Sequence, residues 1–203
     1  MNYYNKHAKE YIENTKDCDM SVQYNFFLKY LKEKSYILDV GFGSGRDMLY
    51  FNSLGYNTKG IDITKEFVEN GKSLNLDVEE LSVYDLNDKE KYDGIWACAS
   101  LLHCEDLEKA FDRCYKALKK DGIMYASFKY GDFEGIKNER YFKYLNEESM
   151  EELINKTKFK LIDTLITSDV REDRSDEKWL NIIIGKRKWK CEKNILRFLL
   201  LCS

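Results

Sequence analysis

Three glycines at alternate positions, Gly41, Gly43 and Gly45, follow Asp39 within the stretch YILDVGFGSGRD at 36–47. The apolar residues that precede Asp39 predict a strand, and a helix is expected to begin near Arg46. Glycine lets the backbone turn with positive φ and approach a ligand closely, and the free N–H groups of a helix start can face that ligand. Glycine clusters also occur in ordinary turns, but this arrangement is typical of a loop that binds a cofactor.

The spacing of the glycines distinguishes between two cofactor classes. A dinucleotide fingerprint reads G-x-G-x-x-G, and counting from Gly41 its third glycine falls at Arg46. The observed pattern, D-x-G-x-G-x-G, resembles motif I of the class I S-adenosylmethionine (SAM) dependent methyltransferases. The resemblance implies that the methionine half of SAM lies over the glycine loop. It also implies that Arg46 pairs with the methionine carboxylate, although a solvated residue in the first helical turn is the alternative.

Acidic residues follow three successive predicted strands, at Asp39, Asp62 and Asp85. Ligands of doubly wound sheets bind at the carboxyl ends of the strands, but each Asp could also simply cap the next turn. The resemblance implies that Asp62 holds the two ribose hydroxyls by charge-assisted hydrogen bonds. It further implies that Asp85 contacts the adenine amino group, that Ile63 and Leu86 flank the ring, and that Asp39 holds the glycine loop or the cofactor's ammonium group.

A second block, YDGIWACASLLHCEDLEKAFDRCYKALKKDGIMYASFKY at 92–130, also resembles this family, so the likeness covers about 36–130. The resemblance places Trp96, Ala97, Cys98 and Ser100 beside the methionine portion of SAM. His103 follows this predicted strand directly, where it could take a proton from an acceptor hydroxyl, amine or acid. A structural turn residue is the other interpretation, and many methyl transfers depend mainly on alignment of the reactants.

Residues outside the cofactor core are expected to contact the acceptor. Tyr4 and Tyr11 share one face of a predicted N-terminal helix, which either covers the site as a lid or packs on the sheet. Arg140, Arg171 and Trp179 are expected in loops near the mouth of the pocket. Arginines there could hold a carboxylate or phosphate, or they could pair with nearby acidic residues.

The pattern of helices and strands predicts an α/β fold with a doubly wound, mostly parallel, seven-stranded sheet. Helices are expected near 4–15, 21–33, 45–54, 64–73, 106–119 and 147–156, and strands near 36–40, 56–61, 77–83, 92–97, 123–128, 158–167 and 178–186. Alternation of strands and helices favours a parallel sheet. A loop is expected at 129–146, and the last two strands, with no helix between them, should form an antiparallel hairpin. This Rossmann-like architecture is the one that the resemblance implies.

Composition limits the function further. The chain has 203 residues, 43% of them hydrophobic and 34% charged, with a net charge of −3, which indicates one globular domain at 1–203. Within it we expect an N-terminal helical lid at 1–35 and a basic and apolar tail at 187–203. The six cysteines and two histidines lack the clustering of a metal site, so no metal is expected. No secretory signal or transmembrane run is apparent, and free thiols favour a reducing cytoplasm.

The sequence therefore predicts a SAM-dependent methyltransferase that transfers a methyl group to a small or medium-sized acceptor. Proline is absent, which excludes the Asn/Asp-Pro-Pro-aromatic loop and the Pro-Cys nucleophile of many base methyltransferases. A tRNA or protein acceptor remains open, because the basic tail could recruit either. Two rivals remain as well: a catalytically inactive cofactor-binding subunit, and a nicotinamide-dependent oxidoreductase.

Overall fold

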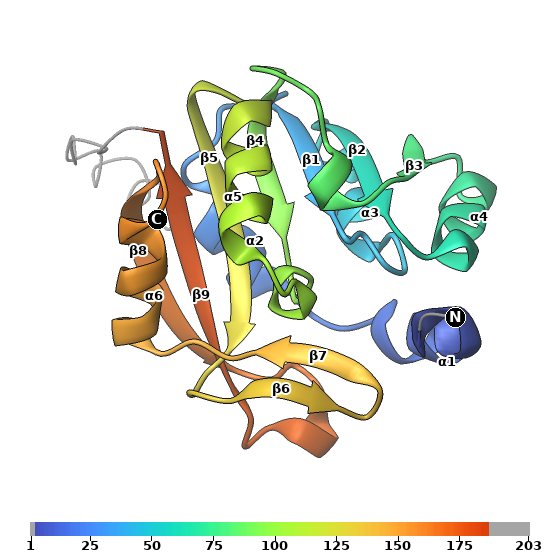
Figure 1. Ribbon diagram of the computed structural model, residues 1–203. Coiled ribbons are helices and arrows are strands. Elements are labelled where there is room, and N and C mark those ends of the chain that lie inside the picture. Colours follow the sequence, from blue (N-terminus) through green and yellow to red (C-terminus); the bar gives the residue numbers. More distant parts are fainter. Residues whose placement is uncertain (1–2, 187–203) are drawn as a thin grey trace, which may run out of the picture.

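The computed structural model describes residues 3–186 (Figure 1), so the tail predicted at 187–203 lies outside the described residues. The α-helices are α1 (Tyr3–Thr15), α2 (Ser21–Leu28), α3 (Arg46–Ser53), α4 (Lys65–Ser73), α5 (Leu107–Ala117) and α6 (Glu147–Asn155), and the short 3₁₀ helices are η1 (Val83–Asp85), η2 (Leu101–His103) and η3 (Glu172–Arg174). The strands are β1 (Tyr36–Val40), β2 (Asn57–Asp62), β3 (Val78–Glu80), β4 (Tyr92–Ala97), β5 (Leu118–Lys129), β6 (Glu134–Lys137), β7 (Arg140–Lys143), β8 (Lys160–Ser168) and β9 (Lys178–Gly185).

Seven strands form one sheet in the order β3-β2-β1-β4-β5-β9-β8. Strands β1 to β5 pair in parallel, whereas β9 is antiparallel to both β5 and β8. The predicted doubly wound sheet with a C-terminal antiparallel hairpin is therefore confirmed. The strand order reverses between β1 and β4, and the carboxyl ends at such a switch point are where ligands bind in this architecture.

Both faces of the sheet are buried, as expected for parallel strands covered by helices. In β1, Ile37 packs on the side of α2 and α3 with Phe27 and Phe51, whereas its neighbour Leu38 belongs to the cluster on the side of α5 with Phe111. Successive side chains of a strand point to opposite faces, so the continuous apolar run of β1 serves both layers. Figure 1 shows α5 and α6 over one face of the sheet.

A second, two-stranded sheet lies within the segment that was expected to be a loop at 129–146. Strands β6 and β7 form an antiparallel hairpin in which Lys137 pairs with Arg140. The two turn residues, Asn138 and Glu139, both have positive φ, at 50° and 60°, which is the conformation of a type I′ hairpin turn. Glycine, which such turns favour, is missing here, and this is why the loop prediction for the hairpin was wrong.

Three other predicted elements differ in their limits. Helix α2 ends at Leu28, and the chain continues in tighter turns, with Tyr30 N–H donating to the Phe27 carbonyl. The strand expected at 77–83 is confined to β3, and η1 follows it. Strand β5 already begins at Leu118, and its pairing with β4 shifts register between Tyr92 and Gly94, so the Asp121-Gly122 pair lies within a strand rather than before it.

The N-terminal helix and the extra hairpin lie at the functional end of the sheet. Figure 1 shows α1 and the β6–β7 hairpin beside the edge at which β1, β4 and β5 end. Within residues 3–186, no helix has both the length and the apolar character needed to cross a bilayer.

Candidate functional site

The glycine loop between β1 and α3 depends on backbone conformations that only glycine adopts readily. Gly41, Gly43 and Gly45 have φ values of 73°, 53° and 84°. A Cβ at Gly41 would lie 2.5 Å from Cβ of Ser100, and a Cβ at Gly43 would lie 3.1 Å from the ring of Tyr11. Conformation and close contact therefore both require glycine at Gly41.

Asp62 ties the end of β2 to this loop. Its carboxylate accepts hydrogen bonds from the backbone N–H groups of Gly43, at 3.2 Å, and Thr64, at 2.8 Å. The carboxyl is buried. Burial raises its pKa above the ordinary value for Asp, and the N–H groups of Thr64 and Gly43 partly oppose that rise. A largely buried acidic group thus lies at the carboxyl end of β2, next to the glycine loop.

Asp39 lies behind the loop rather than in an open space. Its side chain is only 2% exposed, and its Oδ2 has no hydrogen-bond partner. Burial and then the nearby Asp47 raise its pKa well above the usual range. Asp39 lines neither of the two cavities described next.

The first cavity, here called the glycine-loop cavity, has a volume of about 340 Å³. Among the predicted cofactor residues it is lined by Gly41, Gly43, Asp62 and Ile63, and by apolar side chains that include Phe67. Its size falls within the range typical of small-molecule sites. The cavity therefore brings together the glycine loop, the β2 carboxylate and an apolar wall.

The segment after β3 contributes to this cavity differently from the prediction. Ser82, Val83 and Tyr84 line it, whereas Asp85 and Leu86 do not. Asp85 is exposed and Leu86 is buried in the core. Ser100 also lines the cavity, and its buried hydroxyl has no hydrogen-bond partner. The resemblance placed Ser100 beside the methionine portion of SAM, but its contact with Gly41 could not be predicted, because nothing local to η2 indicates it.

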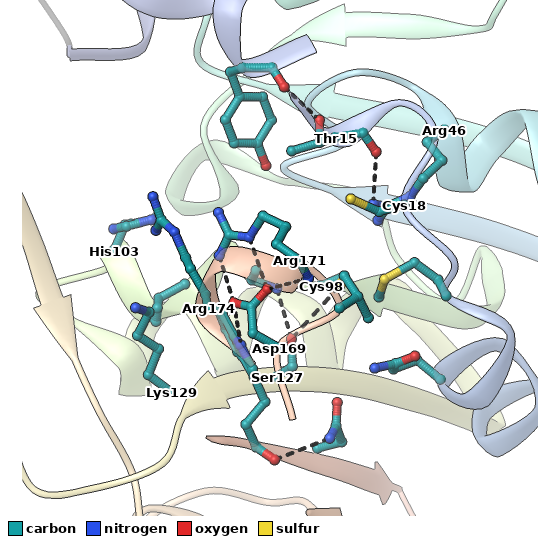
Figure 2. A pocket seen from close by; sticks show the side chains of 18 of the residues that line it. Thr15, Cys18, Arg46, Cys98, His103, Ser127, Lys129, Asp169, Arg171 and Arg174 are labelled. Carbon is teal, nitrogen blue, oxygen red and sulfur yellow. Dashed lines mark hydrogen bonds and ion pairs between the residues drawn. The ribbon is translucent and has the colours of Figure 1, made fainter. Parts of the chain in front are cut away.

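The second cavity, here called the arginine cavity, has a volume of about 140 Å³ and lies beside the first. Arg46, Cys98 and Arg171 line it (Figure 2), and so does Trp179. Burial raises the pKa of the Cys98 thiol to about 12, so this group is a neutral thiol and not a nucleophile. Two predicted cofactor residues, Arg46 and Cys98, therefore line the arginine cavity, whereas Asp62 lines the glycine-loop cavity.

The two predicted cofactor residues not yet placed have structural positions. Gly45 precedes α3 as its N-cap residue, and a Cβ there would lie 2.8 Å from Cδ1 of Leu76. Ala97, the last residue of β4, is fully buried. Neither lines a cavity.

The two cavities adjoin each other and share a set of lining residues, here called the shared wall. Tyr4, Tyr11, Ala99, His103 and Arg140 line both. These residues come from α1, from the segment that runs from the end of β4 through η2, and from β7, so three distant parts of the chain meet there. The N-terminal helix thus contributes two tyrosines to the site in addition to packing on Phe67.

His103 is held from both sides of its ring. Its Nδ1 lies 2.7 Å from the carbonyl oxygen of Tyr141, and its Nε2 lies 2.9 Å from the hydroxyl of Tyr4. A carbonyl only accepts, so Nδ1 carries the hydrogen and Nε2 of the neutral ring accepts from Tyr4. Arg140 donates to the same Tyr4 oxygen at 3.1 Å. Burial lowers the pKa of His103 to about 4, with a further lowering by Arg140.

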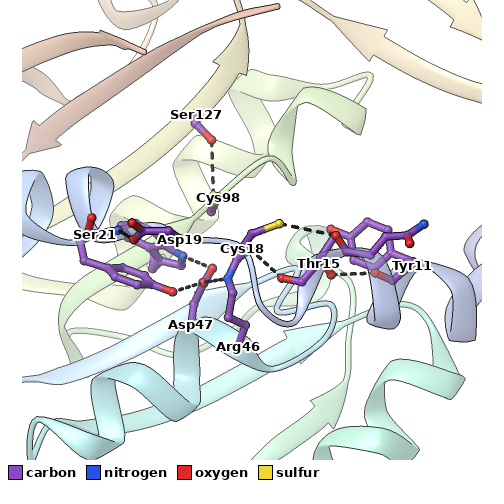
Figure 3. Close-up of polar contacts among 12 residues, drawn as sticks. Tyr11, Thr15, Cys18, Asp19, Ser21, Arg46, Asp47, Cys98 and Ser127 are labelled. Atoms are coloured by element: carbon purple, nitrogen blue, oxygen red, sulfur yellow. Dashed lines mark hydrogen bonds and ion pairs between the residues drawn. The ribbon is translucent and has the colours of Figure 1, made fainter. Parts of the chain in front are cut away.

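Arg46 is tied into a buried network (Figure 3). It donates to Asp47 at 2.6 Å and to the carbonyl oxygen of Thr15 at 3.1 Å. Asp47 also accepts from the Tyr24 hydroxyl at 2.6 Å and from the Trp96 indole at 2.8 Å. Although burial alone would lower the pKa of Arg46, Asp47 raises it above its ordinary value. The network joins the first turn of α3 to the C-terminal end of α1. Sequence reasoning did not identify Asp47.

Arg171 has a carboxylate partner within the arginine cavity. It donates to both oxygens of Asp169, at 2.9 and 2.6 Å, and Trp179 donates to Asp169 at 3.0 Å. These hydrogen bonds lower the pKa of the Asp169 carboxyl against the opposing effect of burial. Of the alternatives left open for Arg171, the structure shows pairing with an acidic neighbour.

No group of three or more His, Cys, Asp or Glu side chains within residues 3–186 is arranged to hold a metal ion. The arrangement instead offers two adjoining cavities, a neutral imidazole with an accepting nitrogen, and a buried carboxylate. It suits the binding of two molecules whose reacting groups meet at the shared wall.

Comparison with known proteins agrees with this geometry. Residues 38–126 match a protein family described as a methyltransferase domain. The chain is 32% identical over 104 residues to phosphoethanolamine N-methyltransferase of Plasmodium falciparum, covering 46% of this chain and 39% of that protein. It is 33% identical over 95 residues to ubiquinone biosynthesis O-methyltransferase of Pelagibacter ubique, covering 44% and 40%. The matches thus span about two fifths of these curated relatives.

Among solved structures, 1,6-didemethyltoxoflavin-N1-methyltransferase of Burkholderia thailandensis, with bound 1,6-didemethyltoxoflavin and S-adenosylhomocysteine, has a similar fold. The TM-score is 0.74 at 19% identity, and the match covers 91% of this chain and 84% of the other. Residues 38–126 of this chain are therefore similar in sequence to methyltransferase domains, and the fold of the chain is similar to that of a solved methyltransferase.

Proposed function

We propose that this chain binds SAM in the glycine-loop cavity and transfers its methyl group, by in-line displacement, to a small or medium-sized acceptor in the arginine cavity. The observation that carries the proposal is the shared wall of Tyr4, Tyr11, Ala99, His103 and Arg140. Two cavities that meet at one wall allow a donor and an acceptor to be aligned, which is the main requirement of methyl transfer.

The glycine-loop cavity has the chemistry that SAM requires. The backbone of Gly41 and Gly43 approaches it without side chains, and Asp62 supplies a carboxylate for the ribose hydroxyls. The unpartnered hydroxyl of Ser100 offers a further polar contact. When bound, SAM supplies a methyl group on a positively charged sulfur. We propose that Asp39 supports the loop from behind, because it lies next to the loop but outside the cavity.

The remaining predicted cofactor roles are proposed in modified form. Arg46 donates hydrogen bonds to Asp47 and to the Thr15 carbonyl. To contact the methionine carboxylate of SAM, it must give up the hydrogen bond to Thr15. Asp85 is exposed and does not line the cavity, so the proposed adenine contact passes from Asp85 to neighbouring residues. We propose that Ser82 and Tyr84, which line the cavity, contribute to the adenine end. Gly45 and Ala97 then act through the backbone and packing.

His103 is proposed as the base that finally takes up the proton released by the methyl acceptor. The acceptor gives its proton to the Tyr4 oxygen while Tyr4 passes its own hydrogen to Nε2 of His103, across the 2.9 Å contact between them. The Tyr141 carbonyl keeps Nδ1 protonated throughout. Helix α1 thereby acts as a lid, because Tyr4 and Tyr11 line both cavities and exclude water from the shared wall.

The volume of the arginine cavity favours a small acceptor group. About 140 Å³ is close to the roughly 150 Å³ of a cavity that accommodates benzene. The named relatives act on phosphoethanolamine and in ubiquinone biosynthesis, so both amine and hydroxyl acceptors are candidates. Arg171 and Trp179 line the same cavity and are proposed to shape it around the acceptor.

Calorimetry of the folded full chain with SAM, S-adenosylhomocysteine (SAH) and, as a control, NADH tests the first half of the proposal. We expect both sulfur compounds to bind and NADH not to. A screen for SAH release then follows, with phosphoethanolamine and simple phenols among the acceptors. Failure of SAM and SAH to bind a folded sample would overturn the proposed function, and tight binding without turnover would indicate a cofactor-binding subunit.

A further inference from the structure

The arginine cavity collects positive charge from a chain whose net charge is −3. Five cationic side chains line it: Arg46, Lys129, Arg140, Arg171 and Arg174. Asp169 is the one carboxylate among the described residues that line it. Figure 2 shows Lys129, Arg171 and Arg174 around Asp169, with Arg46 and His103 farther along the same cavity.

Four of these cations have carboxylate partners. Arg46 pairs with Asp47 at 2.6 Å and Arg171 with Asp169 at 2.6 Å. Lys129 pairs with Glu177, which directly precedes β9, and Arg174 pairs with its chain neighbour Asp173 at 3.7 Å. The charge of these four side chains is therefore already balanced within the protein.

Arg140 differs from the other four. Among the carboxylates that the structure describes, none forms an ion pair with it, and the neighbouring Glu139 pairs with Lys6 instead. Aromatic rings surround its guanidinium, with Tyr3 at 4.4 Å and Phe142 at 5.0 Å from ring centroid to Cζ. Its Nε is buried and has no hydrogen-bond partner. The guanidinium of Arg140 is thus held beside both cavities with no carboxylate counterion among the described residues, and its Nε has no hydrogen-bond acceptor.

We propose that Arg140 binds an oxyanion, a carboxylate or phosphate group, carried by the methyl acceptor. This inference rests on the proposed function, because it places the acceptor in the arginine cavity. A guanidinium offers a planar fork of donors that matches a carboxylate or phosphate in two parallel hydrogen bonds. Stacking on Tyr3 and Phe142 fixes the plane of that fork before the acceptor arrives, which lowers the entropic cost of binding.

The location of Arg140 gives the oxyanion a second effect. Arg140 donates to the Tyr4 hydroxyl, which in turn donates to Nε2 of His103. The positive charge of Arg140 contributes to the low pKa of His103. A bound oxyanion offsets that charge, so the imidazole becomes a better proton acceptor when the acceptor is in place. An acceptor that lacks the oxyanion would leave His103 in its less basic state.

The test is a titration of the SAH-loaded full chain, followed through the ¹⁵N–¹H signal of the Arg140 Nε–H group. Sodium phosphate and sodium acetate are the two probes, and sodium chloride at equal ionic strength is the control. We expect a saturable shift of the Arg140 signal with at least one probe and none with chloride. The stronger probe distinguishes a phosphate-bearing from a carboxylate-bearing acceptor.

Variants assign the effect to this residue. Arg140→Lys, which retains the charge but loses the fork, should weaken binding of the effective probe at least about tenfold. Arg113→Lys is the matched control, because it makes the same substitution at an arginine that lines neither cavity and donates to Asn87. The affinity of this variant should change by less than about twofold. If SAH binds and neither probe shifts the wild-type signal, the inference is wrong while the proposed function stands. If SAH itself does not bind, the proposed function fails instead.

Discussion

The hydroxyl of Tyr4 lies 2.9 Å from Nε2 of His103, although the two residues are 99 positions apart in the chain. The contact joins the N-terminal helix to the turn after β4, and both residues line both cavities. Because Nδ1 donates to the Tyr141 carbonyl, the neutral imidazole presents its lone pair to Tyr4. This one contact thus links the position of α1 to the hydrogen bonding of the imidazole.

The low pKa of His103 makes stability depend on pH. Its folded pKa of about 4 lies below the unfolded value of about 6.5, so at intermediate pH the unfolded chain binds more protons. Stability from this residue is therefore fully present above about pH 6.5 and is lost as pH falls towards 4, by on the order of 3 kcal/mol in total. Urea unfolding between these pH values measures it.

The control for this prediction is His103→Gln, which removes the titrating group. The stability of the variant should depend less steeply on pH over the same window. Equal pH dependence in wild type and variant would show that His103 is not the group responsible.

Asp62→Ala should weaken SAH binding by about 2–3 kcal/mol, the cost of losing charge-assisted hydrogen bonds to the cofactor. Asp85→Ala is the matched control, because the same truncation is made at an acid that is exposed and outside the cavity. We expect it to change affinity by less than about 0.5 kcal/mol. Calorimetry with SAH measures the affinity of both variants. A loss of affinity in Asp85→Ala of more than about 0.5 kcal/mol would mean that Asp85 contacts adenine, as the resemblance implies, although its side chain is exposed in the structure.

Local pattern was enough to predict the sheet and the glycine loop. The apolar run of β1 and the acids at the ends of strands depend on short-range spacing, and the structure places Gly41, Gly43 and Asp62 around one cavity. The shared wall was not predictable in the same way, because Tyr4, His103 and Arg140 meet only through the packing of three separate segments. The strand β7, and therefore the position of Arg140, was not predicted, because the hairpin turn before it contains no glycine.

The sequence also could not predict which carboxylate each buried arginine pairs with. Arg171 was expected to pair with some nearby acid, but nothing in the sequence selects Asp169 over the other carboxylates of the same loop. The selection comes from Trp179, which donates to Asp169 from the next strand. Asp47 was overlooked for a similar reason, since its three donors Tyr24, Arg46 and Trp96 include two from distant segments.

Gly41→Ala should destabilise the protein by about 1–3 kcal/mol more than Gly55→Ala does. Both glycines have positive φ, 73° and 84°, but a Cβ at Gly55 meets nothing within 4 Å, whereas one at Gly41 lies 2.5 Å from Cβ of Ser100. Gly55→Ala therefore measures conformational strain alone, about 1 kcal/mol. The double variant Gly41→Ala with Ser100→Gly should recover most of the difference in urea unfolding. Equal losses for the two single variants would refute the close contact.

Asp47→Asn should lower the free energy of unfolding by about 3–5 kcal/mol, because it leaves the buried guanidinium of Arg46 without its counterion. The carboxylate accepts from Tyr24, Arg46 and Trp96, and an amide replaces one accepting oxygen by a donor.

The matched control for the Asp47 prediction is Asp112→Asn on the surface of α5, where an ion pair with Lys116 is largely solvated and its loss should cost less than about 1 kcal/mol. If the unpaired charge is the cause, replacing Arg46 as well, in Arg46→Met with Asp47→Asn, should be less damaging than the sum of the two single changes. Urea unfolding of the four variants and wild type measures this coupling. Strict additivity would mean that Asp47 stabilises the protein through Tyr24 and Trp96 alone, and that Arg46 is free to leave Asp47 for the cofactor.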